Sequence, residues 1–126
     1  MAGEKILIVD DNPMNMELTS DLLEQHGFQV LQAESAKTGI EIAISKKPDL
    51  ILMDINLPGM DGIEATKILR KNTATMNIPV VAITAHAMEG DKEKILKAGC
   101  VGYVPKPINT REFPLIIKKF LMNNKP

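Results

Sequence analysis

The stretch KPDLILMDINLPGMDG, residues 47–62, places an uncharged apolar run directly before a carboxylate. Residues 50–53 read LILM, a continuous apolar run that is typical of a central strand covered on both faces of a parallel sheet. Asp54 ends this run, and burying a lone carboxylate is unfavourable unless it takes up a proton. Asp54 therefore needs solvent, a hydrogen-bond cage or a cation.

Similar apolar runs recur along the chain, and each is followed by a helix-like segment of ten or more residues. The runs are residues 6–9, 28–31, 50–53, 80–83 and 102–104. This alternation predicts βαβ units on one parallel sheet, and therefore an α/β fold. The first, third and fourth runs suit central strands, whereas the second and fifth are weaker and suit the sheet edges.

The helix-like segments carry start signals and apolar faces. N-caps are predicted at Asn12, Ser35 and Asp61. The first helix has an apolar stripe of Leu18, Leu22 and Leu23, and the last has Phe113, Ile116, Ile117, Phe120 and Leu121 at helical spacing. Pro114 lies near the first turn of the last helix, so the sequence does not determine at which residue that helix begins.

Composition indicates one globular domain over residues 1–126, with a polar tail at residues 123–126. Fifteen Lys and Arg residues stand against sixteen Asp and Glu residues, without a basic block, so the composition supports neither a nucleic-acid footprint nor a polybasic membrane patch. The chain has one cysteine, Cys100, expected to be a small buried hydrophobe, and two distant histidines, so no zinc cluster is predicted. No signal peptide or membrane-spanning stretch is recognised, and we expect a cytoplasmic protein.

Polar residues follow the apolar runs at the ends where a parallel sheet binds its ligands. They are Asp10, Asp11, Asp54, Thr84 and Lys106. Three clustered carboxylates repel one another, and an oxygen-only site of this kind suits Mg²⁺. A lysine and a hydroxyl suit a phosphoryl group in transfer, and Asp54 is placed to be the nucleophile. Taken alone, Asp54 is more typical of a turn residue, so the prediction rests on the set.

Four motifs in this order and spacing resemble the receiver domain of two-component response regulators, the CheY-like superfamily. They are ILIVDD, LILMDINLPGMDG, VVAIT and GYVPKP, and together they span essentially the whole chain. The resemblance is closest in type to single-domain, DivK-like regulators and to receiver modules of hybrid histidine kinases. It implies a flavodoxin-like (βα)5 sandwich, doubly wound, with five parallel strands in the order 2-1-3-4-5.

The resemblance also implies roles for the acidic residues. Asp54 would be the phosphoacceptor, and Asp10 and Asp11 the acidic pair, with Asp11 the more direct Mg²⁺ ligand and Asp10 acting largely through water. Asn56 would give its backbone carbonyl to the metal. Asn56 and His86 would tune the lifetime of the acyl phosphate, although a loop histidine without a role remains an equal alternative for His86.

On the phosphoryl side, the resemblance assigns contacts to Thr84 through its hydroxyl, to Ala85 through its backbone N–H, and to Lys106. It also implies a cis bond between Lys106 and Pro107. Tyr103 would move inward as Thr84 is drawn toward the phosphoryl group. This movement would link the site to a surface of the fourth helix, fifth strand and last helix, where a downstream protein binds.

The function expected is a single-domain, monomeric response regulator in a phosphorelay. It accepts a phosphoryl group onto Asp54 from a phosphohistidine of a histidine kinase or histidine phosphotransferase, with Mg²⁺, and is not a turnover enzyme. A receiver module of a hybrid kinase and a phosphorylation-independent binding module remain alternatives. A phosphatase of the haloacid dehalogenase type is less favoured, because that family needs an aspartate where this chain has Asn56. A nucleotide-binding role lacks both a G-x-G-x-x-G motif and a P-loop.

Overall fold

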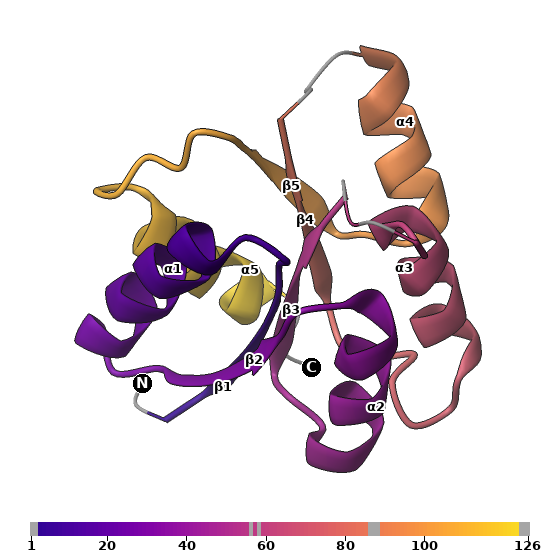
Figure 1. Ribbon diagram of the computed structural model, residues 1–126, viewed down its shortest axis with the longest axis horizontal. Helices are drawn as coiled ribbons and strands as arrows, with labels where there is room; N and C mark the ends of the chain where they lie inside the picture. The colour runs from indigo at the N-terminus through magenta and orange to yellow at the C-terminus, as the bar shows by residue number, and fades with distance from the viewer. Residues whose placement is uncertain (1–2, 56, 58, 86–88, 124–126) are drawn as a thin grey trace.

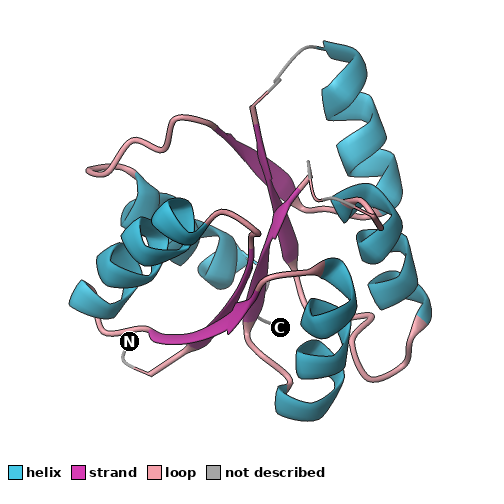
Figure 2. Ribbon diagram, in the orientation of Figure 1, coloured by secondary structure: helices cyan, strands magenta, loops and turns pink. Residues whose placement is uncertain are grey.

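The computed structural model describes residues 3–55, 57, 59–85 and 89–123, in which five strands alternate with five helices (Figures 1 and 2). The strands are β1 (Lys5–Val9), β2 (Gln29–Ala33), β3 (Leu50–Asp54), β4 (Val80–Thr84) and β5 (Gly102–Pro105). The helices are α1 (Pro13–Gln25), α2 (Ala36–Lys46), α3 (Gly62–Lys71), α4 (Glu89–Ala98) and α5 (Phe113–Asn123). None of the helices in these ranges is both long enough and apolar enough to cross a bilayer.

The five strands form one parallel sheet in the order β2-β1-β3-β4-β5. Helices α1 and α5 cover one face of this sheet, and α2, α3 and α4 cover the other (Figure 1). Alternate residues of β1 enter two separate cores, with Ile6 and Ile8 on the α1 and α5 side and Leu7 and Val9 on the other. The predicted flavodoxin-like, doubly wound sandwich is confirmed.

The edge strand β2 does not occupy the predicted range of residues 28–31. Phe28 is buried, but its N–H donates to the Leu23 carbonyl at 3.1 Å, so it belongs to the turn that closes α1. The strand instead continues through Gln32, whose side-chain Nε2 donates to Ser20 Oγ at 2.8 Å. The predicted bounds of β2 were wrong because the polar residue Gln32 interrupts the apolar run of this edge strand.

The predicted N-caps are confirmed, each by a side-chain oxygen that accepts backbone N–H groups of the first turn. Asn12 Oδ1 accepts from Met14, Ser35 Oγ from Thr38, and Asp61 Oδ1 from Glu64. Near the other end of the chain, α5 begins at Phe113 and places Pro114 in its first turn, where a missing N–H costs least. Asn123 is the last residue of α5 and not the start of a polar tail, and residues 124–126 lie outside the described residues.

The strand register brings the carboxyl ends of the central strands to one edge of the sheet. Asp54 of β3 lies opposite Ile83 of β4, and Thr84 lies opposite Pro105 of β5. Residues that immediately follow β1 and β5 therefore lie beside Asp54 and Thr84. This edge carries the predicted site.

Candidate functional site

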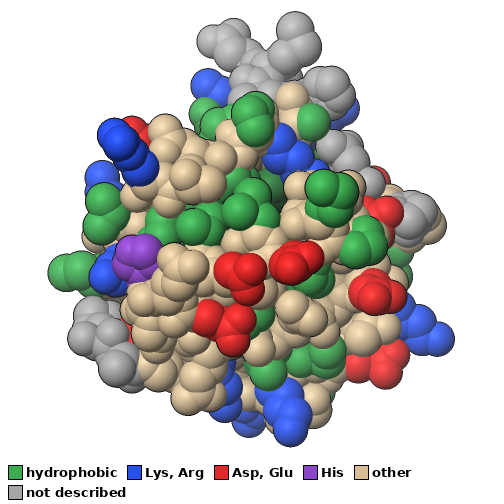
Figure 3. All heavy atoms as spheres, turned by 60° about the vertical axis from the view of Figure 1, so that its left-hand side comes forward, with side chains coloured by type: hydrophobic (Ala, Val, Ile, Leu, Met, Phe, Trp, Pro, Cys, Tyr) green, Lys and Arg blue, Asp and Glu red, His purple; other side chains and the backbone are tan. Residues whose placement is uncertain are grey.

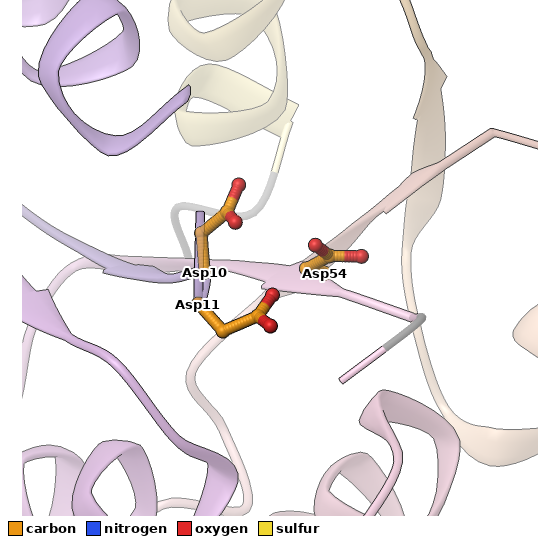
Figure 4. Close-up of side chains that lie close together, drawn as sticks. All are labelled: Asp10, Asp11 and Asp54. Carbon is orange, nitrogen blue, oxygen red and sulfur yellow. The ribbon is translucent and has the colours of Figure 1, made fainter. Parts of the chain in front are cut away.

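Three carboxylates meet at the carboxyl ends of β1 and β3 (Figure 4). Asp10 and Asp11 follow β1, and Asp54 is the last residue of β3. Each offers one oxygen that lies within 4.8 Å of the oxygens of the other two. Asp10 is 3% exposed and Asp54 is 2% exposed, whereas Asp11 is open to solvent. The structure thus brings together three of the residues that the sequence analysis places at this edge of the sheet.

Lys106 brings a positive charge to this cluster from the segment that connects β5 to α5. Its Nζ donates to Asp54 Oδ2 at 3.0 Å, and its side chain is 23% exposed. Its backbone N–H donates to the Thr84 carbonyl at 2.8 Å, which ties the segment to the end of β4. The peptide bond between Lys106 and Pro107 is cis, as the family resemblance implied.

The donor set fits a hard divalent cation. One ammonium group offsets only part of the charge of three carboxylates, and the ligands that these residues offer are all oxygens. Mg²⁺ prefers oxygen ligands and is commonly held by one or two protein carboxylates while it keeps several waters. Asp10, Asp11 and Asp54 are therefore suitable ligands, whereas Asn56, which was assigned a backbone ligand role, lies outside the described residues.

The pKa of Asp10 is raised above its ordinary value. Burial is the main cause, since desolvation disfavours the charged carboxylate, and the neighbouring charge of Asp54 acts in the same direction. The Asn12 N–H donates to Asp10 Oδ1 at 2.9 Å and opposes the shift. The metal-free site therefore favours a proton on Asp10 relative to the unfolded chain.

This shift predicts how the stability of the metal-free protein depends on pH. A raised folded-state pKa makes stability highest below the ordinary aspartate pKa, and stability then falls as pH rises through the window up to the raised value. Asp10→Asn keeps an oxygen that accepts the Asn12 N–H and removes the charge. We expect it to abolish this fall and to raise the free energy of unfolding at neutral pH by about 1 kcal/mol. Urea denaturation in the presence of a chelator, at about two pH values per pH unit from pH 4 to 8, checks this expectation. If the free energy of unfolding changed with pH in the same way for both proteins, the prediction would be contradicted.

The other predicted residues lie around the cluster. Thr84 is buried at the end of β4, and Ala85 follows it at the surface. Tyr103 is half-buried on β5 and packs against the core on the side of α2, α3 and α4. His86, predicted to tune the lifetime of an acyl phosphate, lies outside the described residues.

A pocket of about 370 Å³ opens beside Asp10 and Lys106. Its remaining lining residues are Asn15, Leu18, Pro107 and Ile108. Leu18 belongs to the apolar stripe predicted for the first helix, and it is 42% exposed and lines this pocket. On the face shown in Figure 3, hydrophobic side chains lie next to a group of acidic ones. Helical periodicity alone does not distinguish a core leucine from one that borders a binding site.

Another residue that sequence patterning did not assign to the site is Gly62, the first residue of α3. A Cβ added there would overlap the Asp54 carbonyl oxygen and lie 2.9 Å from Ile55 Cα. Helix α3 thus approaches the backbone of Asp54 and Ile55 with no side chain between them. The signal in the sequence was the glycine itself, directly after the Asp61 cap.

Comparisons with known proteins agree with this geometry. The family profile described as the response regulator receiver domain matches residues 6–118. The polar-differentiation response regulator DivK of Brucella ovis is 42% identical over 118 residues, which cover 94% of this chain and 96% of the relative.

Solved structures show the same similarity in three dimensions. A CheY-like receiver domain protein from Methanospirillum hungatei has a TM-score of 0.89 at 30% identity, covering 98% of this chain and 97% of that one. The receiver domain of a sensor histidine kinase from Pseudomonas aeruginosa has a TM-score of 0.88 at 34% identity, covering 96% and 99%. That structure holds a magnesium ion in its active-site cleft. The chain therefore belongs to the family of response regulator receiver domains.

Proposed function

We propose that this chain is a single-domain response regulator that accepts a phosphoryl group on Asp54. The observation that carries the proposal is the ion pair of 3.0 Å between Lys106 Nζ and Asp54 Oδ2, set beside two further carboxylates. A buried carboxylate held next to an ammonium group at an open sheet edge is suited to attack an electrophile that is itself an anion. The site therefore favours phosphoryl transfer over a purely structural role for Asp54.

In the proposed reaction, an Asp54 carboxylate oxygen attacks the phosphorus of a phosphohistidine. The new O–P bond forms as the P–N bond breaks, and the bonding electron pair returns to the imidazole nitrogen of the donor. Lys106 then exchanges its bond to the free carboxylate for a bond to a phosphoryl oxygen. Thr84, through its hydroxyl, and Ala85, through its N–H, donate to the other oxygens.

When bound by Asp10, Asp11, Asp54 and the Asn56 carbonyl, Mg²⁺ supplies positive charge that offsets the charge of the carboxylates and of the phosphoryl oxygens. The family resemblance supports Asp11, which is open to solvent, as the more direct ligand in this proposal. Asp10 contributes largely through water. The protein's own part is to hold these oxygens close together before the donor arrives.

The output passes through Thr84 and Tyr103. As Thr84 bonds to the phosphoryl group, Tyr103 moves inward and changes the surface formed by α4, β5 and α5, to which a downstream protein binds. Asn56 and His86 influence access of water to the acyl phosphate and hence its lifetime. Both conformations exist before phosphorylation, and the phosphoryl group shifts their populations.

The partners are a histidine kinase or histidine phosphotransferase and a protein that receives the signal in the cytoplasm. The chain acts as a monomer, without nucleic acid or membrane, and is not a turnover enzyme. The DivK relative is covered over 96% of its length, which supports the single-domain form. The likeness to the receiver domain of a Pseudomonas aeruginosa histidine kinase favours, as a second candidate, a receiver module with the same chemistry.

Intact-mass measurement tests the proposal. Incubation of the protein with acetyl phosphate and Mg²⁺ is expected to add about 80 Da, which peptide mapping places on Asp54. Because the metal offsets charge at the site, a chelator is expected to slow the reaction at least about 100-fold. Absence of the adduct, or sustained turnover of p-nitrophenyl phosphate in its place, contradicts the proposal and favours the phosphatase alternative.

A further inference from the structure

Lys92 of α4 lies over the ring of Tyr103 on β5. Its Nζ is 5.4 Å from the ring centroid, within the distance at which a cation is attracted to an aromatic face. Both side chains are only partly exposed, which strengthens such a contact relative to one in open solvent. The contact joins the helix and the strand of the proposed output surface.

The sheet places Tyr103 next to Thr84 on the same face. Ala82 packs into the core on the side of α2, α3 and α4, and strand alternation puts Thr84, two residues later, on that side too. Tyr103 lies opposite Ala82 in the register, so Thr84 and Tyr103 are diagonal neighbours on adjacent strands. Long and aromatic side chains reach across this diagonal separation. The position of Thr84 therefore affects the space open to the Tyr103 ring.

We propose that Lys92 is a restraint that holds Tyr103 in the conformation seen here and so opposes the switch until Asp54 is phosphorylated. This inference rests on the proposed function, because it assigns a regulator to the same Thr84 and Tyr103 pair. If the ring moves inward, it leaves the ammonium group, and the favourable contact is lost. Lys92 therefore stabilises the unphosphorylated conformation selectively, which is the condition for shifting a two-state equilibrium.

The other lysines described on α4 provide the contrast. Lys94 and Lys97 are exposed, whereas Lys92 is partly buried and lies over the Tyr103 ring. Removing the charge of Lys94 changes the net charge of the helix by the same amount without touching the ring. The pair Lys92→Met and Lys94→Met thus controls for the loss of one positive charge from α4.

The chain has one tyrosine and no tryptophan, so a ring probe reports on Tyr103 alone. We would incorporate 3-fluorotyrosine and record ¹⁹F spectra of wild type, Lys92→Met, Lys92→Arg and Lys94→Met, each before and after phosphorylation by acetyl phosphate. Before phosphorylation, Lys92→Met is expected to populate the resonance of the phosphorylated wild type about two- to fivefold more than the wild type does. Its rate of phosphorylation is expected to rise by a similar factor. Lys92→Arg, which keeps a cation, and Lys94→Met are expected to match the wild type.

Two results would overturn the restraint. One is a Lys92→Met spectrum and phosphorylation rate equal to those of a wild type that does become phosphorylated. The other is an equal change in Lys94→Met, which would assign the effect to net charge. A wild type that acquires no phosphoryl group on Asp54 instead overturns the proposed function, so the two failures are distinguished by the same samples.

Discussion

Asp54→Asn is expected to abolish the phosphoryl adduct while the folded structure remains. The carboxamide has nearly the shape of the carboxylate but is a poor nucleophile, so the rate of adduct formation should fall at least about 1000-fold. The free energy of unfolding is expected not to fall. The substitution removes the attraction of Lys106 for Asp54, but it also removes repulsion between Asp54 and two neighbouring carboxylates. Intact mass and urea denaturation in a chelator measure the two effects.

Asp21→Asn is a matched control, because Asp21 is an exposed aspartate of α1 outside the three-carboxylate cluster. It makes the same chemical change and is expected to leave adduct formation within about twofold of the wild type. An adduct that persists in Asp54→Asn at the wild-type rate would assign the phosphoryl group to another residue. Equal binding of a partner by wild type and Asp54→Asn would favour the phosphorylation-independent binding module.

The central part of the fold was predictable because its strands are buried on both faces. Continuous apolar runs at β1, β3 and β4 have no polar residue to interrupt them, and their residues are almost completely buried. The edge strand β2 was misplaced because its ends depend on tertiary contacts. Phe28 is buried by the turn after α1, and Gln32 is kept in the strand with a side-chain bond to Ser20.

The candidate site was predictable for a geometric reason. Parallel strands bring their carboxyl ends to one edge, so Asp10, Asp54 and Lys106 meet although they are far apart in the chain. The pocket wall was not predictable in the same way. Leu18 has helical spacing to Leu22, but whether such a residue is covered depends on what packs against α1. The spacing of apolar residues along α1 carries no information about which other element packs against the helix at Leu18.

The close approach of α3 to β3 is a contact of backbone on backbone, which apolar periodicity does not encode and for which Gly62 is the signal in the sequence. The Gly62 N–H donates to the Ile55 carbonyl at 3.3 Å, and the Gly62 carbonyl accepts from Thr66 Oγ1 at 2.7 Å. Thr66 is buried, as are Ala65 and Leu69 of the same helix. Because these residues anchor the helix in the core, α3 cannot retreat from the strand without disrupting packing along its length.

Gly62→Ala is therefore expected to be severe, with a loss of about 3 kcal/mol in the free energy of unfolding. The added Cβ would overlap the Asp54 carbonyl oxygen and press on Ile55 Cα at 2.9 Å and Met53 Cγ at 3.0 Å. Relief of the overlap on the Asp54 carbonyl requires a backbone shift, and a shift at Asp54 moves its carboxylate relative to Lys106. We expect the phosphorylation rate per folded molecule to fall about 10- to 100-fold. Urea denaturation and single-turnover phosphorylation measure these two losses.

Gly102→Ala makes the same substitution at a position where the nearest atoms belong to a side chain and not to the backbone. Its Cβ would overlap the far end of the Phe120 ring, so the overlap is with a half-buried side chain of α5 and not with backbone atoms. We expect a loss below about 1.5 kcal/mol and an unchanged phosphorylation rate, since Gly102 begins β5 at the end away from Asp54. If both variants lost equal stability and Gly62→Ala kept the wild-type rate, the contact of α3 with the Asp54 backbone would not position the carboxylate. A large loss of rate confined to Gly62→Ala would show that α3, through its contact with the Asp54 backbone, positions the Asp54 carboxylate together with Lys106.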